Sequence, residues 1–410
     1  MIYQDKRPFF KKKVVIEGNC LFLVGPIGTF FARLSNFLEE NNVRTYKISF
    51  PLYEYGFPNS RLIKFHQNIY LFKNYLKKII NDKGIKHIFM YGNVLIPHRQ
   101  ALCLVDELKK EDILVNTHIF ELGYLRPNFV TLENKGINYN SSFIKSKEFY
   151  LKQDSYESFP VPKKHARFRI RKIWKTISFI NHSFKNYKIV FKEHKLQPKP
   201  IYIWYQIKGF FLKYYFRLSE FKLKKKCFVE NKFFLVVLQV STDSQITEGS
   251  DIKDNKKFIY KVIKDFAQAN PNNINLVFKH HPRDRGYTNY LNHIEKFSKE
   301  FGVYKKVFYI HDEFLSKIFQ NPNCKGTILI NSTVGYQSLY HSVPVKSLGI
   351  TPYNIEGLTD QRDLISFFKN PSAVDKILFC KFYKYILENS QINGNFDGFF
   401  PFKNIFIFKK

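Results

Sequence analysis

Acidic residues are scarce in this chain of 410 residues. It contains 34 Asp and Glu against 66 Lys and Arg, which gives a formal net charge of +32. An excess of cations on this scale favours polyanionic partners, among them nucleic acids, anionic lipid head groups and sugar phosphates. Phe and Tyr are abundant at 45 and 26 residues, and an AT-rich genome would by itself enrich Phe, Tyr, Lys and Asn. Composition therefore narrows the class of partner without choosing one.

The sequence lacks several motifs that would assign the protein to a disulfide-rich, metal-binding, secreted or membrane-spanning class. The five cysteines are dispersed, and the sequence has no CxxC pair, no Cys and His at metal-ligand spacing and no HExxH. We therefore expect neither a disulfide framework nor a metal. The basic N-terminus is not followed by an apolar core with a cleavage site, and no apolar run reaches about 18 residues. The prediction is a cytoplasmic protein without a transmembrane helix, whose membrane contact is limited to the surface.

Hydrophobic periodicity predicts two α/β parts. Strand-like apolar runs alternate with helix-like stretches from residue 20, and the same rhythm restarts at residue 233. This order predicts mostly parallel sheets with helices on both faces, so we expect two doubly wound Rossmann-type domains. The expected strands are 20–24, 45–50, 87–92, 114–120, 233–240, 274–279, 306–310, 326–331 and 344–350. The expected helices of the first part are 29–42 and 62–82.

The domain boundaries follow from shifts in composition. We place an N-terminal Rossmann-like domain at 1–162, a basic and aromatic-rich helical segment at 163–226, and a C-terminal Rossmann-like domain at 227–370. A helix and tail at 371–410 are expected to pack back on the N-terminal domain. Ligands of doubly wound sheets bind at the carboxyl ends of the strands, so the loops after strands are where chemistry is expected.

The basic segment 163–226 holds 19 Lys and Arg against two Glu, with 15 aromatic residues that include Trp174 and Trp204. These residues are typical of a helix on an anionic bilayer, with aromatic rings among the head groups and cations on the phosphates. An ordinary helical insertion with solvated lysines is the alternative. Single-stranded nucleic acid uses the same residue classes, but no RRM, KH or helix-turn-helix pattern accompanies them, so we expect no nucleic-acid partner.

The stretch "LVGPIGTFFARL" (23–34) indicates a strand, a glycine-rich turn and a helix. Gly25 and Gly28 allow a close approach of the backbone, and Thr29 can cap a helix whose N-terminus faces a ligand. It is not a P-loop, because no Gly-Lys-Ser/Thr follows, and the GxGxxG spacing is absent. A tight structural turn remains the alternative.

Two further loops of the first part carry candidate catalytic residues. Pro97 suits the first turn of a helix, which would place His98 at the mouth of the sheet, although such a histidine is more often structural. Glu121 comes at a strand end, where a carboxylate can act as nucleophile or base, and Arg126 can hold an anion bidentately. A plain ion pair between Glu121 and Arg126 is the alternative.

In the second part, polar residues follow three strands. Gln239, Asp243 and Ser244 follow the first strand in "LQVSTDSQI". A later strand is followed by "NSTVG", in which Asn331, Ser332 and Thr333 offer donors and Gly335 lets the next helix pack closely. Between them, "FKHHPRDRGY" supplies Lys279, His281, Pro282, Arg283 and Arg285. Two anion-favouring loops at neighbouring strand ends predict a phosphate site, and His280 is expected to point into the fold.

Taken together, these stretches resemble the capsule polysaccharide biosynthesis/export family of Gram-negative bacteria, in its KpsS-like branch. The resemblance rests on "GPIGTFFARL", "FELGYLRPNFVTLE", "LQVSTDSQI", "FKHHPRDRGY", "INSTVGYQSLYHSVPVKSLGITPYNIEGLT" and "NGNF", in order along most of the chain. It implies a GT-B-like fold and a metal-independent glycosyltransferase without a cofactor. The implied reaction transfers Kdo from CMP-Kdo to phosphatidylglycerol or lyso-phosphatidylglycerol at the inner membrane, the first step of a poly-Kdo linker. Other capsule assembly proteins are implied as partners.

The resemblance also implies roles for residues. His281, Pro282 and the turn Asn331–Thr333 resemble the CMP-phosphate cradle of related transferases, and the loop Gly25–Thr29 lies in the domain expected to face the acceptor. The family's transferases retain configuration, which implies a carboxylate nucleophile. In C-type relatives the comparable stretch reads Glu-Asp-Gly-Phe with the Asp as nucleophile, whereas Leu122 stands here. Either Glu121 takes that role or the mechanism differs. A scaffold protein without catalysis and a sialyl-type transferase are the alternatives.

Overall fold

The computed structural model describes residues 9–26, 28–50, 56–156, 159, 162–163, 200–241 and 244–409. The chain forms two compact units that interleave along the sequence. Unit 1 consists of Met1–Ser142, Glu157–Pro198 and Lys384–Lys410, and unit 2 of Phe143–Tyr156 and Lys199–Tyr383. The boundaries expected from the sequence, at residues 162, 226 and 370, were consecutive and stay predictions.

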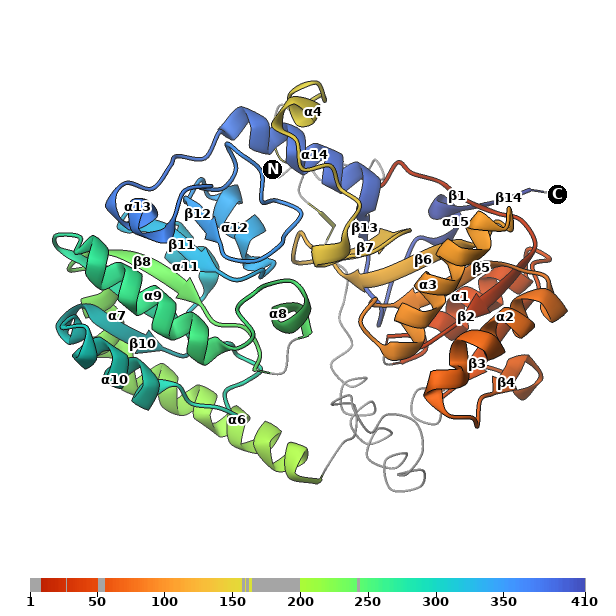
Figure 1. Cartoon of the computed structure of the whole chain (residues 1–410), viewed down its shortest axis with the longest axis horizontal. Coiled ribbons are helices and arrows are strands. Elements are labelled where there is room, and N and C mark those ends of the chain that lie inside the picture. The colour runs from red at the N-terminus through yellow and green to blue at the C-terminus, as the bar shows by residue number, and fades with distance from the viewer. Residues whose placement is uncertain are drawn as a thin grey trace. The chain divides into compact units, whose positions relative to one another are not determined.

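Unit 1 is built on a seven-stranded sheet in the order β13-β7-β6-β5-β2-β3-β4 (Figure 1). Strands β4, β3, β2, β5 and β6 are parallel, whereas β7 and β13 are antiparallel to their neighbours. The bounds are β2 Asn19–Phe22, β3 Thr45–Ser49, β4 Leu62–Lys64, β5 Ile85–Tyr91, β6 Asn116–Leu122, β7 Phe129–Glu133 and β13 Gln391–Asn393. A separate parallel pair joins β1 (Val14–Ile16) to β14 (Phe406–Phe408).

Helices cover both faces of this sheet because its strands are apolar on both sides. Helices α2 (Phe72–Lys83) and α3 (Ile96–Lys110) pack on one face, with Leu21, Ile48 and Ile88 beneath them. Helix α1 (Phe30–Glu39) packs on the other face together with residues of the C-terminal tail, which include α15 (Phe402–Ile405). The tail therefore contributes to the core of unit 1 and supplies strands β13 and β14.

The expectation of one helix over residues 62–82 was wrong in its first half. Residues Leu62–Lys64 form β4, which pairs in parallel with β3, and the helix α2 begins only at Phe72. A turn separates the two, in which Asn68 Oδ1 accepts a hydrogen bond of 3.0 Å from Tyr70 N. The apolar residues of this stretch fit a helical period, but pairing with a neighbouring strand overrides that local preference.

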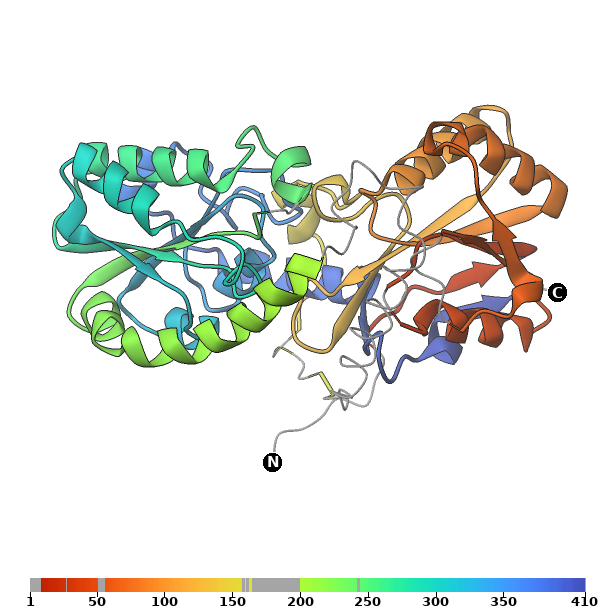
Figure 2. The same ribbon diagram turned by 90° about the horizontal axis from the view of Figure 1, so that it is seen from below.

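Unit 2 is built on a five-stranded, fully parallel sheet in the order β10-β9-β8-β11-β12. Its strands are β8 Lys232–Val237, β9 Ile274–Lys279, β10 Val307–Ile310, β11 Cys324–Leu329 and β12 Val345–Ser347. Helices α9 (Asn255–Ala269), α10 (Leu291–Glu300) and α13 (Leu364–Lys369) form one core with the first face of the sheet. Figure 2 shows this sheet between its two helical layers.

The remaining helices complete unit 2. On the second face of its sheet, Phe228 of α7 packs edge-on against Phe233 of β8, and Ser338 of α12 donates a hydrogen bond to Thr327 of β11. Helix α14 begins in unit 2 and ends in unit 1. The bounds are α4 Lys147–Leu151, α6 Pro200–Ser219, α7 Phe221–Phe228, α8 Ser244–Glu248, α11 Leu315–Phe319, α12 Val334–Tyr340 and α14 Lys376–Ser390. Short 3-10 helices span Asn59–Arg61, Ile69–Leu71, Asn138–Asn140 and Tyr304–Lys306.

Both units share one strand order. Numbered along the chain, the parallel strands of each sheet lie in the order 3-2-1-4-5. This is the doubly wound order, and the expected α/β, GT-B-like fold with two Rossmann-type units is confirmed. In such sheets the ligand binds where the strand order reverses, outside the carboxyl ends of the first and fourth strands. That position, called here the switch point, lies between β2 and β5 in unit 1 and between β8 and β11 in unit 2.

Part of the basic segment is helical, as expected. From Pro200 onward it forms α6 and most of α7, and Trp204 lies in α6 with its side chain exposed. Residues 164–199, with the candidate membrane residue Trp174, lie outside the described residues.

Candidate functional site

The switch point of unit 2 is closed by two amide side chains. Gln239 and Asn331 each stand two residues beyond the last residue of their strand, β8 and β11. Gln239 Nε2 donates a hydrogen bond of 3.0 Å to Asn331 Oδ1, and Asn331 N donates one of 3.1 Å to Gln239 Oε1. Two residues that the sequence predicted separately therefore meet where a ligand of a doubly wound sheet binds.

Asn255, the first residue of α9, supports this pair from below. Its Nδ2 donates hydrogen bonds to Gln239 O at 2.7 Å and to Tyr290 Oη at 3.1 Å, and its side chain is buried. The contact fixes the backbone of the loop after β8. Sequence reasoning missed Asn255. The only feature of the sequence that points to it is that it directly follows Asp254, the N-cap residue of α9.

Asp284 ties the loop after β9 to the loop after β8. Its carboxylate accepts hydrogen bonds from Ser241 N at 2.9 Å, Ser241 Oγ at 3.0 Å and Thr288 Oγ1 at 2.8 Å. The side chain is 1% exposed, so these bonds replace its hydration. Sequence reasoning counted only the cations of "HHPRDRGY" and missed the acid that organises the loop.

The histidines of this loop point in different directions. His280 is buried and bonds Tyr309 Oη at 2.6 Å through Nδ1, and burial lowers its pKa to about 3, which agrees with the expectation that it points into the fold. His281 is only half-buried, and its Nδ1 accepts a bond of 3.1 Å from Arg283 N. The proton of the neutral His281 ring therefore sits on Nε2, which can donate to an anion.

The cations of this loop are not equivalent. Arg285 pairs with Asp312 at 2.5 Å between Nη2 and Oδ1, so its charge is already matched by an acid. Lys279 is 4% exposed, and burial lowers the pKa of its ammonium to about 8. Pro282 and Arg283 are exposed. Of the predicted arginines, Arg283 therefore keeps its charge at the surface, whereas Arg285 supports the loop.

The turn after β11 is shaped by a tyrosine. A Cβ atom on Gly335 would lie 2.3 Å from Cζ of Tyr353, so a glycine is required there, as the expected close packing implied. Tyr353 Oη donates a 2.5 Å bond to Ser332 O, and Ser332 Oγ accepts from Val334 N at 3.2 Å. Thr333 occupies the N-cap position of α12, where its side chain makes no cap bond within the described part of the chain.

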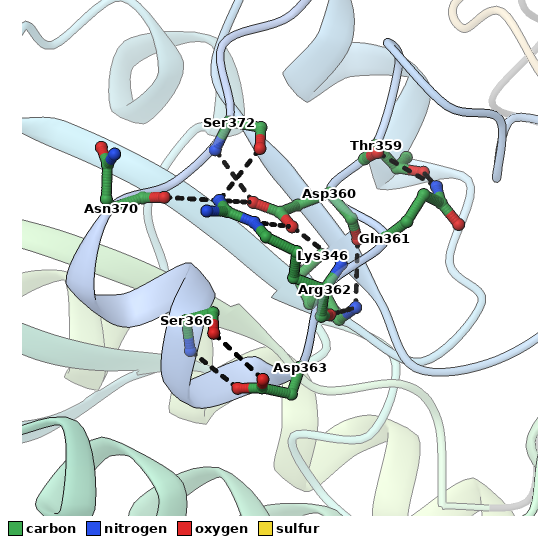
Figure 3. A network of polar contacts seen from close by, with 9 residues as sticks. All are labelled: Lys346, Thr359, Asp360, Gln361, Arg362, Asp363, Ser366, Asn370 and Ser372. Carbon is green, nitrogen blue, oxygen red and sulfur yellow. Dashed lines mark hydrogen bonds and ion pairs between the residues drawn. The ribbon is translucent and has the colours of Figure 1, made fainter.

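The return from β12 to α13 is fixed by a buried carboxylate, as Figure 3 shows. Asp360 accepts bonds from Arg362 Nη2 at 2.5 Å, Arg362 Nε at 3.1 Å and Ser372 N at 2.9 Å. Burial acts to raise the pKa of Asp360, but these donors outweigh it and hold the pKa below its usual range. Lys346 Nζ donates to Asp360 O at 3.0 Å. This network stabilises the loop, and sequence reasoning assigned no role to Asp360 or Arg362.

A carboxylate stands next to the switch point of unit 1, at the carboxyl end of β6, the strand beside β5. Glu121 is the penultimate residue of β6, inside the strand rather than after it. Its Oε1 accepts a bond of 2.8 Å from Leu122 N, and its Oε2 lies 3.7 Å from where a Cβ atom of Gly92 would stand. Gly92 follows β5 with a φ of +72°, and its N–H bonds Phe120 O. The carboxylate is thus held against the loop after β5.

His98 lies behind the same loop. Its Nδ1 bonds Gly92 O at 2.9 Å, and the ring is completely buried, which lowers its pKa to about 3. A catalytic contact needs an accessible ring, so the geometry fits a positioning role, and the catalytic role stays a prediction. The other expected residue, Arg126, is exposed and donates from Nε to Gly123 O at 3.0 Å.

The glycine-rich turn between β2 and α1 also lies at the carboxyl end of the sheet of unit 1. Gly28 has a φ of +116°, and a Cβ atom on Gly25 would lie 2.6 Å from the ring of Phe31. Thr29 stands at the N-cap position of α1, but its side chain makes no cap bond among the described residues, contrary to the capping role expected for it. A buried lysine that sequence reasoning missed, Lys47, donates to Leu23 O at 3.2 Å.

Some predicted residues cannot be placed. Asp243 lies outside the described residues, and of Ser244 only the backbone, as the first residue of α8, is described. Where the chain is described, no group of three or more His, Cys, Asp or Glu could hold a metal ion. The expectation of a reaction without metal or cofactor stays a prediction.

Comparison with known proteins identifies relatives along most of the chain. A family model described as "Capsule polysaccharide biosynthesis protein" matches residues 94–397. The capsule polysaccharide modification protein LipB of Neisseria meningitidis serogroup A is 32% identical over 409 residues, covering 94% of each chain. The capsule polysaccharide export protein KpsS of Escherichia coli is 29% identical over 389 residues, covering 91% of this chain and 95% of KpsS.

Solved structures resemble the chain more distantly. KpsC of Thermosulfurimonas dismutans, a beta Kdo 2,7 transferase, aligns over 90% of this chain and 99% of its own at 16% identity and a TM-score of 0.39. A glycosyltransferase of Rickettsia africae aligns over 90% and 93% at 8% identity and a TM-score of 0.31. Likeness at this level leaves substrate and reaction open.

Proposed function

The chain belongs to the capsule polysaccharide biosynthesis protein family, and from that membership we propose that it transfers Kdo from CMP-Kdo to a lipid. The acceptor in this proposal is phosphatidylglycerol or its lyso form, and the product is the first unit of a poly-Kdo linker. Unit 2 binds the donor and unit 1 supplies the catalytic carboxylate. The reaction uses no metal or cofactor, and other capsule assembly proteins are partners.

The meeting of Gln239 and Asn331 at the switch point of unit 2 carries the donor half of this proposal. Nucleotides bind at this position in doubly wound sheets, and the amide pair fixes two loops there before the ligand arrives. The expectation that the two anion-favouring loops follow neighbouring strands was wrong, because β8 lies between β9 and β11. Asp284 nevertheless ties the loop after β9 to the loop after β8, and the loop after β9 carries His281 and the exposed Arg283, whose chemistry suits a phosphate. Such donors stabilise the charge of a departing CMP without help from a metal.

Glu121 supplies the nucleophile in this proposal. Its carboxylate attacks the anomeric carbon of Kdo while the carbon–oxygen bond to CMP breaks and CMP leaves with the electron pair. A hydroxyl of the lipid then displaces Glu121, and its proton passes to water, so that configuration is retained overall. The bond from Leu122 N and the contact with Gly92 support this role, because they hold the carboxylate in one orientation.

Two other functions fit the same family. A sialyl-type transferase would use the same phosphate-binding groups, and a scaffold component of capsule export would need none of this chemistry. The carboxylate of Glu121, held at the carboxyl end of β6 in unit 1 by the N–H of Leu122, favours catalysis over a scaffold role. A scaffold has no need for an oriented carboxylate at the position where doubly wound sheets bind their ligands. We therefore rank the Kdo transferase first.

The test is mass spectrometry of the lipid after the full chain has been incubated with CMP-Kdo and phosphatidylglycerol. We expect the mass of one Kdo unit to be added, and no product when CMP-sialic acid replaces the donor. Transfer from the sialyl donor alone would favour the first rival. A chain that binds CMP-Kdo but transfers nothing, with or without added capsule proteins, would favour the scaffold.

A further inference from the structure

Helix α6 presents two faces of different character. Its inner face follows a helical spacing through Tyr205, Gly209, Leu212 and Phe216, all half-buried, and ends at the buried Glu220. The inner face of α6 packs against the rest of unit 2. Apolar side chains on the opposite side of the helix therefore do not contribute to the core of unit 2. On an ordinary surface helix that opposite side is polar.

The outer face of α6 is apolar and exposed instead. It gathers eight of the large hydrophobic side chains that are exposed in the described parts of the chain, and Leu218 and Phe221 are 79% and 75% exposed. The outer face consists of Trp204, Ile207, Phe210, Phe211, Tyr214, Tyr215, Leu218 and, at the start of α7, Phe221. At 100° per residue these side chains span roughly 140° of the helix.

Cations border this apolar stripe on both sides. Lys208 flanks one side, and Lys213 and Arg217 flank the other, all of them exposed. No acid occurs between Pro200 and Ser219. An apolar aromatic stripe with cations on both sides is complementary to an anionic bilayer, where rings lie among the head groups and cations on the phosphates. A protein partner would not require that combination.

We propose that the outer face of α6 docks on the surface of an anionic lipid bilayer. The helix lies in the plane of the interface, because none of the described helices is long and apolar enough to cross a membrane. Tyr and Trp suit this depth, since each has an apolar ring and a polar atom that stays wet. The proposal goes beyond sugar transfer and holds whether or not the chain transfers Kdo.

The inner face joins α6 to the loops after β9 and β10 of unit 2. Phe216 stacks on His311 with ring centroids 3.5 Å apart, and Glu220 Oε1 accepts from His311 Nδ1 at 2.6 Å. A Cβ atom on Gly286 would lie 1.9 Å from Tyr205 O, so only glycine allows this approach. Gly286 belongs to the loop after β9, so this loop lies directly against the backbone of α6. Docking of α6 would therefore fix the distance between the loop after β9 and the membrane surface.

Tryptophan fluorescence can test the docking directly, because Trp174 and Trp204 are the only tryptophans of the chain. The full-length variant Trp174→Phe makes Trp204 the sole reporter. With vesicles of phosphatidylglycerol and phosphatidylcholine we expect a blue shift of its emission and quenching by brominated lipid. With phosphatidylcholine alone the response should be much weaker, and salt should reduce it.

Substitutions separate the apolar and the charged contributions. In the Trp174→Phe background, Phe210→Ser, Phe211→Ser and Leu218→Ser together should lower the partition coefficient by about 10- to 100-fold. Each of Lys208→Gln, Lys213→Gln and Arg217→Gln should lower it about fivefold on anionic vesicles only. The matched control replaces three comparably exposed side chains elsewhere, Leu71→Ser, Leu114→Ser and Phe314→Ser, and should leave it unchanged.

Three outcomes would overturn the proposal. Blue emission from Trp204 without lipid, unchanged by vesicles, would mean that another segment of this chain, such as 164–199, covers the outer face. If the parent chain sediments as a dimer and the triple serine variant as a monomer, a second copy of the chain covers the outer face. Equal binding by the triple variant and the control would place lipid contact elsewhere. Because no donor sugar is present, none of these results bears on the proposed transfer.

Discussion

The two units of this protein have the same strand order and different chemistry at the point where that order reverses. In unit 2 the point is closed by the neutral pair Gln239 and Asn331, with cations on the neighbouring loop. In unit 1 the loop after β5 is flanked by the carboxylate of Glu121 and backed by the buried ring of His98. Neutral amides and cations suit a phosphate, whereas a carboxylate would repel it.

The difference teaches that the shared fold decides where a ligand can bind, while the side chains at the strand ends decide which ligand and what reaction. Unit 2 is equipped to hold an anionic leaving group, and unit 1 to attack or deprotonate. Substitutions that exchange or remove these properties in one unit at a time test that division.

The largest effect is expected from Glu121→Gln, which removes the charge of unit 1 and keeps the size of the side chain. The carbonyl oxygen of the new amide can still accept from Leu122 N, so the loop should keep its shape. We expect kcat to fall by about 10³-fold or more, because an amide cannot form the glycosyl-enzyme bond. Affinity for CMP should not change, and both quantities can be measured by a transfer assay and by calorimetry.

The matched control is Glu107→Gln, which removes an exposed carboxylate of the same unit that pairs with Lys73. Activity of this variant should equal that of the parent chain. A normal kcat for the Glu121→Gln enzyme would show that Glu121 is not the nucleophile. It would not contradict the proposed donor site of unit 2.

The second effect concerns charge at the switch point of unit 2. The substitution Asn331→Asp keeps an acceptor for Gln239 Nε2 but brings a negative charge to a predicted phosphate site. We expect CMP to bind about 50-fold more weakly, whereas Asn331→Ala, which only removes the bond, should weaken it about tenfold. Titration calorimetry with CMP measures both. If the Asn331→Asp variant binds CMP better than the Asn331→Ala variant, the site does not hold a phosphate.

The smallest effect compares a buried carboxylate of each unit. Glu133 of β7 accepts bonds from Tyr124 Oη and Ser141 Oγ, both at 2.6 Å, yet burial outweighs them and raises its pKa to about 7. The folded chain thus binds this proton more tightly than the unfolded one. Its contribution to the free energy of unfolding is full below the ordinary pKa of 4.5 and is lost as the pH rises through about 7.

We therefore expect the free energy of unfolding of the parent chain to fall by roughly 1–2 kcal/mol relative to Glu133→Gln between about pH 5 and pH 8. Urea denaturation at both pH values measures the difference. Asp360 should behave oppositely, because its lowered pKa contributes stability above its usual range that is lost as the pH falls. Parallel pH profiles for the parent chain and Glu133→Gln would contradict the raised pKa.

Local sequence was a good guide where one element determines its own conformation. The strands β2, β5 and β6 carry apolar residues that are buried on both faces of the sheet, and such short runs predict parallel strands. It was a poor guide where pairing is distant. Strands β13 and β14 have three residues each and exist only because they pair with β7 and β1, far away in the chain.

The same division holds for the candidate site. Position after a strand predicted Gln239, Asn331 and Glu121 as candidates, because the ends of parallel strands meet at one edge of a sheet. Their bonding partners could not be predicted. Arg285 was expected to add charge for a ligand, but it pairs with Asp312, and the two meet only through the register of β9 and β10.

The amino-acid sequence by itself determined the α/β class of both parts, the basic character of the chain and the loops that carry polar residues, because periodicity, charge and order along the chain are local properties. The tertiary structure decided which of these residues meet. It paired Gln239 with Asn331, buried His98, and turned the aromatic side of α6 outward. These outcomes depend on strand order and helix packing, which join residues that no local pattern relates.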